Sequence, residues 1–306
     1  MRERAFATAI VAVVLFVGAA WARGAEEARI DLTEAQIRAI EAAAPAQAPA
    51  KPAQARKVLV YGRVPTHPDS VPSCFKAVEI MGRKSGAFEA VSSGDPSCFL
   101  PENLKQFDAI VMNNTHEGTP FLPWSFKELT AEQQKAAKDQ EVVLKKSFLD
   151  FVSSGKGLVG IHGATCSVQW PEYLEVMGGA YGTHISGEVF VKAEEGDHPV
   201  CAGFGAEGIK VNDEIYIFRE PYSRKSVRVL AGLDLSRTQD PQKRADKDYA
   251  VSWVRQYGKG RVFYCSLGHT PPTYTHRRVL QHMLAGIQFA MGDLQGEAWP
   301  VQGGGR

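Results

Sequence analysis

The chain has 306 residues, of which 44% are hydrophobic and 23% are charged, and its 35 basic and 34 acidic residues give a formal net charge of +1. This composition is typical of a globular protein with a substantial core. The balanced charge excludes the strong positive field that gathers nucleic acid, and no basic block with interleaved aromatic residues indicates such a partner.

The first 22 residues have the pattern of a secretory signal peptide. Arg2 and Arg4 precede an apolar run over residues 5–20, and Ala20-Trp21-Ala22 supplies a small-x-small cleavage site. The run is shorter than the roughly 20 residues of a membrane span, so we predict export to the periplasm or the exterior with no lasting membrane anchor. An uncleaved anchor is the alternative interpretation.

Residues 23–56 predict a short helix followed by an Ala/Pro-rich linker. Thr33 is followed by Glu34, and apolar residues then recur at helical spacing. Residues 44–56 consist largely of alanine, proline and glutamine, a composition typical of an extended linker. We therefore separate this region from a catalytic domain expected over residues 57–294, which a flexible tail over residues 295–306 follows.

From residue 57 onward, strand and helix signals alternate. Short apolar runs predict strands and longer periodic runs predict helices, at residues 57–62 (strand), 73–86 (helix), 87–93 (strand), 107–114 (strand), 129–155 (helix) and 157–162 (strand). Such units predict a mainly parallel sheet covered by helices on both faces. Ligands bind beyond the carboxyl ends of the strands in such sheets, which marks Arg63, residues 113–116 and residues 162–166.

The second half of the domain is richer in strands, which we expect at residues 187–195, 208–218, 227–233, 249–258 and 261–269. A Gly-Lys-Gly turn at residues 258–260 predicts a hairpin between the last two. A helix over residues 276–292 closes the domain. The predicted fold class is therefore an α/β sandwich with a mainly parallel central sheet and a strand-rich C-terminal half.

Export would change how the five cysteines are interpreted. Cys74 and Cys98 lie in two similar short sequences, PSCF and PSCFL, and an oxidising compartment would permit a disulfide between them. Free buried thiols are the alternative, because connectivity does not follow from sequence.

A histidine occupies a corner where many α/β enzymes carry a nucleophile. The sequence GIHGA places Gly160, Gly163 and Ala164 around His162, which resembles the Gly-x-nucleophile-x-Gly pattern of a sharp strand-to-helix turn. Cys166 lies about one helical turn further on and is an alternative nucleophile, although nothing beside it indicates an activated thiolate.

Five stretches of the chain together resemble the ThuA-like (trehalose utilisation) family: GLVGIHGAT, YLEVMGGAYGTHISGEVFV, GDHPV, NDEIYIF and SWVRQYGKGRVFYCSLGHT. The resemblance runs from about residue 57 to about residue 294. It implies membership of the class I glutamine amidotransferase-like superfamily, a flavodoxin-like three-layer sandwich and a role in carbohydrate metabolism. Relatives in that superfamily carry a cysteine at the corner, so His162 argues against glutamine hydrolysis by that route.

Histidines at strand ends and in loops form the candidate site. We expect His116, His162, His184 and His269 in such positions, where strand ends can converge on one cleft. His162, His184 and His269, with a carboxylate nearby, would suit a divalent metal such as zinc, and the same imidazoles could move protons without a metal. The alternative is that each ring only satisfies backbone groups, which is the role we expect for His198, His276 and His282.

Asp213 and Glu214 are adjacent in a strand, so their side chains point to opposite faces and only one can reach a cleft. We favour Glu214. Candidate substrate-binding residues are Asn114, His116, Trp170, Tyr181 and His184, since polar groups can bind a sugar and aromatic faces can stack on its ring. For the aromatic residues, the alternative is a place in the core.

The sequence therefore predicts an exported protein that binds and transforms a small carbohydrate, such as a sugar or keto-sugar, as an isomerase, lyase or hydrolase. His162 would act as the base, with His269 and Glu214 as the other catalytic residues. A non-catalytic carbohydrate-binding or scaffold module and an amidotransferase that uses Cys166 are the alternatives. The pattern leaves the oligomeric state open.

Overall fold

The computed structural model describes residues 31–301, apart from residues 64–66, 117–119, 168 and 240–241. The predicted signal peptide lies outside the described residues. In this part of the chain one sheet of nine strands has the order β2-β1-β3-β4-β9-β8-β7-β5-β6. The strands are β1 (Lys57–Tyr61), β2 (Glu89–Ser93), β3 (Ala109–Asn113), β4 (Gly157–Ile161), β5 (Ala180–Ala193), β6 (Ile209–Arg219), β7 (Arg228–Leu233), β8 (Ala250–Tyr257) and β9 (Gly260–Cys265).

The sheet is parallel on one side and antiparallel on the other. Strands β2, β1, β3, β4 and β9 run parallel to their neighbours, whereas the pairs β9/β8, β8/β7, β7/β5 and β5/β6 are antiparallel. The predicted α/β class is confirmed, as is the hairpin, in which Tyr257 pairs with Gly260. The sequence predicts a mainly parallel sheet, but only its first half is parallel, because the C-terminal strands pair antiparallel. The flavodoxin-like order of layers stays a prediction.

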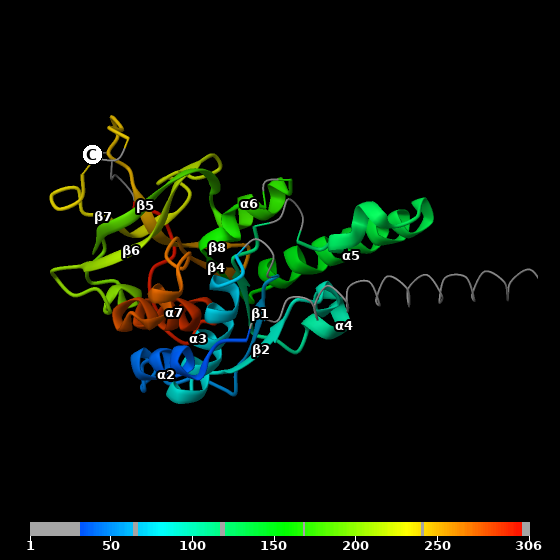
Figure 1. Cartoon of the computed structure of the whole chain (residues 1–306), viewed down its shortest axis with the longest axis horizontal. Helices are drawn as coiled ribbons and strands as arrows, with labels where there is room; N and C mark the ends of the chain where they lie inside the picture. Colours follow the sequence, from blue (N-terminus) through cyan, green and yellow to red (C-terminus); the bar gives the residue numbers. More distant parts are fainter. Residues whose placement is uncertain (1–30, 64–66, 117–119, 168, 240–241, 302–306) are drawn as a thin grey trace, which may run out of the picture.

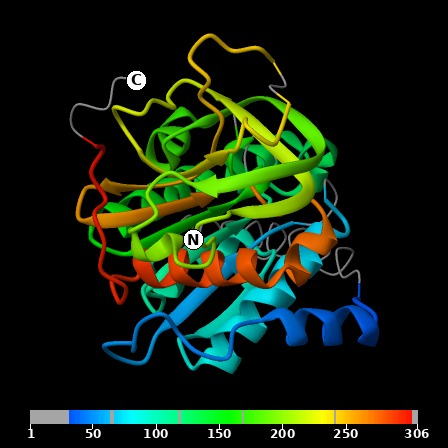
Figure 2. The same cartoon turned by 90° about the vertical axis from the view of Figure 1, so that its left-hand side faces the viewer.

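Helices pack on both faces of the sheet (Figure 1 and Figure 2). Because strand side chains alternate, Val58 and Val60 of β1 belong to one core and Leu59 and Tyr61 to the other. The helices of the first core are α2 (Glu34–Ala43), α3 (Ser70–Ser85) and α7 (Arg277–Ala290), and those of the second are α4 (Pro101–Leu104), α5 (Ala131–Ser153) and α6 (Pro171–Met177).

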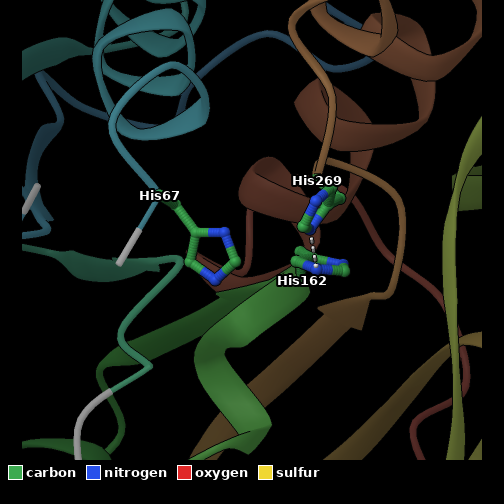
Figure 3. Close-up of side chains that lie close together, drawn as sticks. All are labelled: His67, His162 and His269. Atoms are coloured by element: carbon green, nitrogen blue, oxygen red, sulfur yellow. Dashed lines mark hydrogen bonds between the residues drawn. The ribbon is translucent and has the colours of Figure 1, made fainter. Parts of the chain in front are cut away.

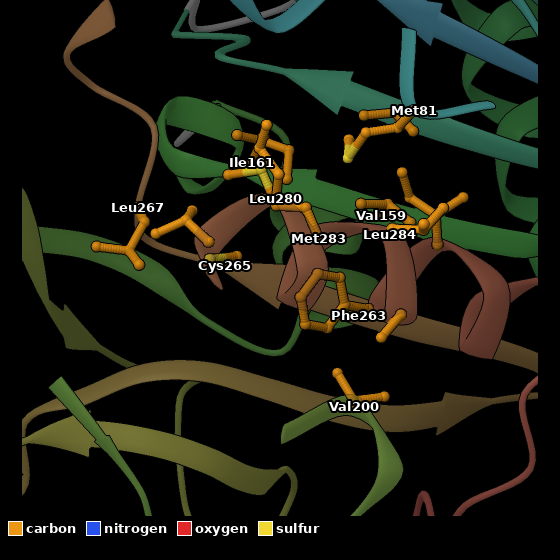
Figure 4. Packing of buried hydrophobic residues seen from close by; sticks show 14 of the residues in the cluster. Met81, Val159, Ile161, Val200, Phe263, Cys265, Leu267, Leu280, Met283 and Leu284 are labelled. Atoms are coloured by element: carbon orange, nitrogen blue, oxygen red, sulfur yellow. The ribbon is translucent and has the colours of Figure 1, made fainter. Parts of the chain in front are cut away.

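The first core joins the two strands that matter most for the site. Figure 4 shows Val159 and Ile161 of β4 beside Phe263 and Cys265 of β9, with side chains of α7 packed over them. Gly286 of α7 lies against the ring of Phe263, where a Cβ atom would come within 2.2 Å of the ring. This close packing fixes the ends of β4 and β9 relative to each other.

The segment that the sequence set apart from the domain packs against it. Helix α2 begins at the capping box of Thr33 and Gln36, and it buries Ile40 in the first core. Further along, the side chain of Gln288 exchanges two hydrogen bonds with the backbone of Ala50. Residues 31–56 therefore contribute to the fold of the domain.

Two further expectations differ from the structure. Strand β5 begins at Ala180 rather than near residue 187, so His184 lies within a strand and not in a loop. Cys74 and Cys98 are both free thiols, because Cys74 is buried in the first core whereas Cys98 packs against the second, on the opposite face of the sheet. Among the described residues, no helix has the length and apolar character needed to cross a membrane.

Candidate functional site

The corner after β4 holds His162 in a left-handed conformation with φ of 44°. The ring is fully buried, and its Nδ1 lies 2.7 Å from the carbonyl oxygen of Ser266. A carbonyl can only accept, so Nδ1 carries a proton, and in the neutral ring Nε2 presents a lone pair. The hydroxyl of Tyr264 donates to the carbonyl oxygen of His162 at 2.8 Å, which holds the strained backbone in place.

The loop after β9 brings His269 to this corner. Nδ1 of His269 lies 3.0 Å from Nε2 of His162, so with both rings neutral His269 is the donor. Asp213 anchors the loop, since its carboxylate accepts hydrogen bonds from the backbone of Gly268 and Thr270 and from the hydroxyl of Thr273. A side chain on β6 thus positions a ring that follows β9.

Glu214, the next residue of β6, points the opposite way and faces the imidazoles. Its Oε1 lies 3.5 Å from Nε2 of His162 and 3.6 Å from Nδ1 of His269, and its Oε2 lies 3.4 Å from Nε2 of His184. Burial alone would raise the pKa of Glu214, but a hydrogen bond from His162 and the positive charges that His269, His162 and His184 carry when protonated lower it to about 2. Glu214 is therefore a carboxylate at neutral pH.

His184 contacts the carboxylate oxygen of Glu214 that does not face His162 and His269. It lies on β5, opposite Tyr216 of β6, and its side chain is 44% exposed. Nδ1 of His184 is 2.9 Å from the hydroxyl of Tyr181. The ring therefore links Glu214 to a partly exposed tyrosine at the surface and does not join His162 and His269 in one ligand group.

A fourth imidazole, absent from the site predicted from the sequence, lies beside His162 and His269. His67 lies just before α3, in the connection that leaves β1, and its ring centroid is 5.1 Å from that of His269 and 5.7 Å from that of His162. Figure 3 shows the three rings gathered in one place. Burial, together with His162, His116 and His269, lowers the pKa of His67 to about 3, so this ring is neutral at neutral pH.

One nitrogen from each of His67, His162 and His269 lies within 4.8 Å of the others, which is a grouping that could hold a metal ion. The sequence had placed His184 in this set. The rule that marks the ends of parallel strands had pointed to Arg63 after β1, and applying it a few residues further along would have reached His67.

Of the remaining predicted residues, two lie near His67, His162 and His269, and one does not. His116 is exposed, with its ring centroid 5.2 Å from that of His67, and Asn114 is buried with its amide nitrogen bonded to Asn113. Trp170 is only 3% exposed and packs within an aromatic group of the second core, consisting of Phe121, Phe148 and Tyr173. Its ring therefore has no free face for a sugar.

Cys166 lacks the character of a nucleophile. Its side chain is buried, and its sulfur lies 3.5 Å from the hydroxyl of Tyr216. Burial raises the pKa of the Cys166 thiol to about 12, so the thiolate that would attack an amide is scarce at neutral pH.

A separate hollow of about 670 Å³ lies at the opposite edge of the sheet. It is lined by His198, Arg261 and Trp299, among other residues, and Arg261 opens β9 whereas His269 follows its end. His198 accepts a hydrogen bond from the backbone of Val200 and so orders a turn, the structural role that its sequence context predicts. None of the histidines around Glu214, nor His67, lines this hollow.

Comparison with known proteins gives a family and a fold. Residues 57–290 match the model of the ThuA family, which is described as trehalose utilisation. The structure is similar to that of a ThuA-like protein from Bacteroides uniformis (TM-score 0.55, 21% identity, 78% of this chain and 94% of that one). It is also similar to that of a ThuA-like protein from Parabacteroides merdae (TM-score 0.55, 17% identity, 83% and 96%). A search of curated proteins found no match.

Proposed function

The chain belongs to the ThuA family, described as trehalose utilisation, and we propose that it binds and transforms a carbohydrate that carries a carbonyl group. The reaction we propose is proton transfer at the carbon next to that carbonyl. Its site is the group of side chains around Glu214, namely His162, His184 and His269.

The position of Glu214 carries this proposal. Its ionised carboxylate contacts buried His162 and half-buried His269 through one oxygen and the exposed ring of His184 through the other. Nε2 of His184 lies 3.4 Å from Oε2 of Glu214, and Tyr181 is bonded to the other ring nitrogen. These contacts give a proton taken by Glu214 a route to solvent through His184 and Tyr181.

The proposed proton transfer can lead either to isomerisation, which keeps the substrate in one piece, or to elimination, which releases part of it. Glu214 removes the proton from the carbon next to the carbonyl, and the electron pair of the C–H bond moves onto the carbonyl oxygen. Where the first carbon carries a hydroxyl group, return of the proton to the former carbonyl carbon gives an isomer, because the hydroxyl proton passes to the former carbonyl oxygen and the new carbonyl forms at the first carbon. Elimination follows instead if the enolate re-forms the carbonyl and a carbon–carbon double bond, while the substituent on the next carbon leaves with its bonding electron pair and takes up a proton from solvent.

The burial of His162 changes the role that the sequence suggested for it. A ring with no exposed surface cannot reach a substrate carbon, and its Nδ1 is held by Ser266. We therefore propose that His162 is a positioning residue, which orients His269 and Glu214. His269 is 35% exposed and lies on the side from which a substrate would approach.

Exchange of carbon-bound hydrogen in D₂O tests this proposal. Keto derivatives of trehalose and of other disaccharides are incubated with the protein, and the loss of the proton next to the carbonyl is followed by NMR. Glu214→Gln should slow the exchange at least about a hundredfold, because general acid-base groups contribute 10²–10⁴. Glu188→Gln is the matched control, since Glu188 lies on the same β5/β6 ribbon, paired with exposed Lys210.

Two outcomes would contradict the proposal. Equal exchange rates in the wild type and in Glu214→Gln would remove Glu214 as the base. Binding of sugar with neither exchange nor product would instead favour the non-catalytic carbohydrate-binding module.

We also propose that the protein is exported, with residues 1–22 removed, and that it belongs to the glutamine amidotransferase-like superfamily. Arg2, Arg4 and the apolar run over residues 5–20 support export. N-terminal sequencing of protein from cell fractions tests it: a chain that begins near residue 23 outside the cytoplasm is expected, and an intact cytoplasmic chain would contradict it.

A further inference from the structure

Three histidines from distant parts of the chain meet at the carboxyl edge of the parallel strands. His67 comes from the connection after β1, His162 from the corner after β4, and His269 from the loop after β9 (Figure 3). One ring nitrogen from each lies within 4.8 Å of the others. Such a grouping brings three imidazole nitrogens to one point, and imidazole is a ligand that suits zinc, nickel and copper.

The ring orientation of His162 and the distance between its Nε2 and Nδ1 of His269 are suited to binding one metal ion. Histidines that bind metals usually donate their other ring N–H to a carbonyl or carboxylate, and Nδ1 of His162 donates in this way to Ser266. Two nitrogens bound to one tetrahedral ion at ~2.05 Å lie about 3.3 Å apart. The observed 3.0 Å between Nε2 of His162 and Nδ1 of His269 is close to this separation.

An unpaired nitrogen of His67 is a second observation that supports a bound ion. Its Nε2 is buried and has no hydrogen-bond partner among the described residues, although a buried polar nitrogen normally has one. The side chain is 8% exposed, and the rings of His116, His162 and His269 surround it. A bound ion would give this nitrogen the partner that the protein does not provide.

We propose that His67, His162 and His269 bind one divalent transition-metal ion, with zinc as the reference ion, and leave a coordination position open toward the exposed side. Binding requires His269 to move its ring proton from Nδ1 to Nε2, which changes no net charge. Glu214, whose Oε1 lies 3.5 Å and 3.6 Å from the two nitrogens, places a negative charge beside the ion.

This inference deepens the proposed function and rests on it only for the role of the ion in turnover. At the open position an ion would bind the carbonyl oxygen of the sugar and stabilise the negative charge that develops there. Glu214 and His184 would remain the groups that accept the proton. His184 faces the other oxygen of Glu214 and is not a ligand in this arrangement.

Cobalt binding tests the site without any substrate. Protein stripped with chelator is titrated with Co²⁺, and its visible absorption reports the ligand geometry, while calorimetry with Zn²⁺ gives the affinity and stoichiometry. The wild type should bind one ion per chain. His67→Ala and His269→Ala should each weaken binding at least about a hundredfold, since each removes a direct ligand.

Two further variants keep the result interpretable. His184→Ala removes a histidine that contacts Glu214 but is not a proposed ligand. It should change the affinity for Co²⁺ by less than about threefold. His67→Asn, checked by near-UV circular dichroism, replaces His67→Ala if the latter fails to fold. The absence of Co²⁺ binding, or equal affinity in folded His67→Asn and wild type, would overturn the metal site.

The metal site and the proposed function can fail separately. One tightly bound ion per chain with no exchange of any keto-sugar proton would retain the site and contradict the proposed chemistry. Exchange that continues undiminished in chelator, with no ion bound, would retain the chemistry and overturn the site.

Discussion

Replacing Asp213 by asparagine should destabilise the protein and also disturb the site, although Asp213 touches none of the imidazoles. The carboxylate is 1% exposed and accepts three hydrogen bonds. Its Oδ2 accepts from the backbone of Gly268 at 2.7 Å and from the hydroxyl of Thr273 at 2.8 Å, and its Oδ1 accepts from the backbone of Thr270 at 2.9 Å.

Asparagine keeps one acceptor oxygen and turns the other position into a donor. In its better orientation the amide oxygen retains Gly268 and Thr273, and the amide nitrogen faces the backbone N–H of Thr270. The variant then loses one charge-assisted hydrogen bond, worth about 1.5–3 kcal/mol, and leaves a buried donor unsatisfied. We expect the free energy of unfolding of Asp213→Asn to fall by about 2–4 kcal/mol.

Urea denaturation followed by circular dichroism measures this loss, and an unchanged m-value would show that the denatured state is unaffected. Asp139→Asn is the control, because that carboxylate is 66% exposed and should change stability by less than about 0.5 kcal/mol. Since the loop that Asp213 holds carries His269, we also expect at least about tenfold weaker Co²⁺ binding. Wild-type stability together with wild-type affinity in Asp213→Asn would refute the reasoning.

Three substitutions and one thiol assay test other features of the structure. Ile40→Ala should lower stability by about 2–4 kcal/mol in urea denaturation, because Ile40 is buried in the first core, and no change would show that residues 31–56 do not pack on the domain. Gly268→Ala should weaken Co²⁺ binding measurably, since φ is +131° and a Cβ atom would lie 2.7 Å from a buried tyrosine hydroxyl. Unfolded, unreduced protein should react as five free thiols in a colorimetric assay, whereas three would indicate a bridge between Cys74 and Cys98. Burial raises the pKa of Asp108, but a backbone N–H and two basic side chains outweigh it and hold the pKa below its ordinary value of 3.8. The stability difference between wild type and Asp108→Asn should therefore be present above about pH 3.8 and disappear as the pH falls through the lowered pKa, in denaturation curves recorded over that range.

Much of the site could be predicted from strand ends, because parallel strands bring their carboxyl ends to one edge. This rule places His162 and His269 together, and the alternation of side chains along β6 separates Asp213 from Glu214. Both inferences need only local patterns and one property of sheets. They do not depend on where distant segments pack.

Residues outside such patterns could not be placed in this way. His184 meets Glu214 because Ser186 and Glu214 are paired in the β5/β6 register, and the sequence does not specify that register. His67 lies several residues beyond the end of β1, so the strand-end rule reaches it only when it is extended into the following connection. Residues 31–56 are rich in alanine and proline and bury few apolar side chains. Their composition therefore predicts a linker and does not indicate that they pack on α3 and α7.

The neighbouring residues Asp213 and Glu214 show how one strand can serve stability and chemistry through opposite faces. Asp213 makes all three of its hydrogen bonds to residues 268–273, which fixes the position of His269. Glu214 faces imidazoles from three different segments, with its side chain 14% exposed. Substitution of Asp213 should therefore change stability and metal affinity together. Substitution of Glu214 by glutamine should slow proton exchange while the loop that carries His269 stays in place, because no backbone group of that loop depends on Glu214.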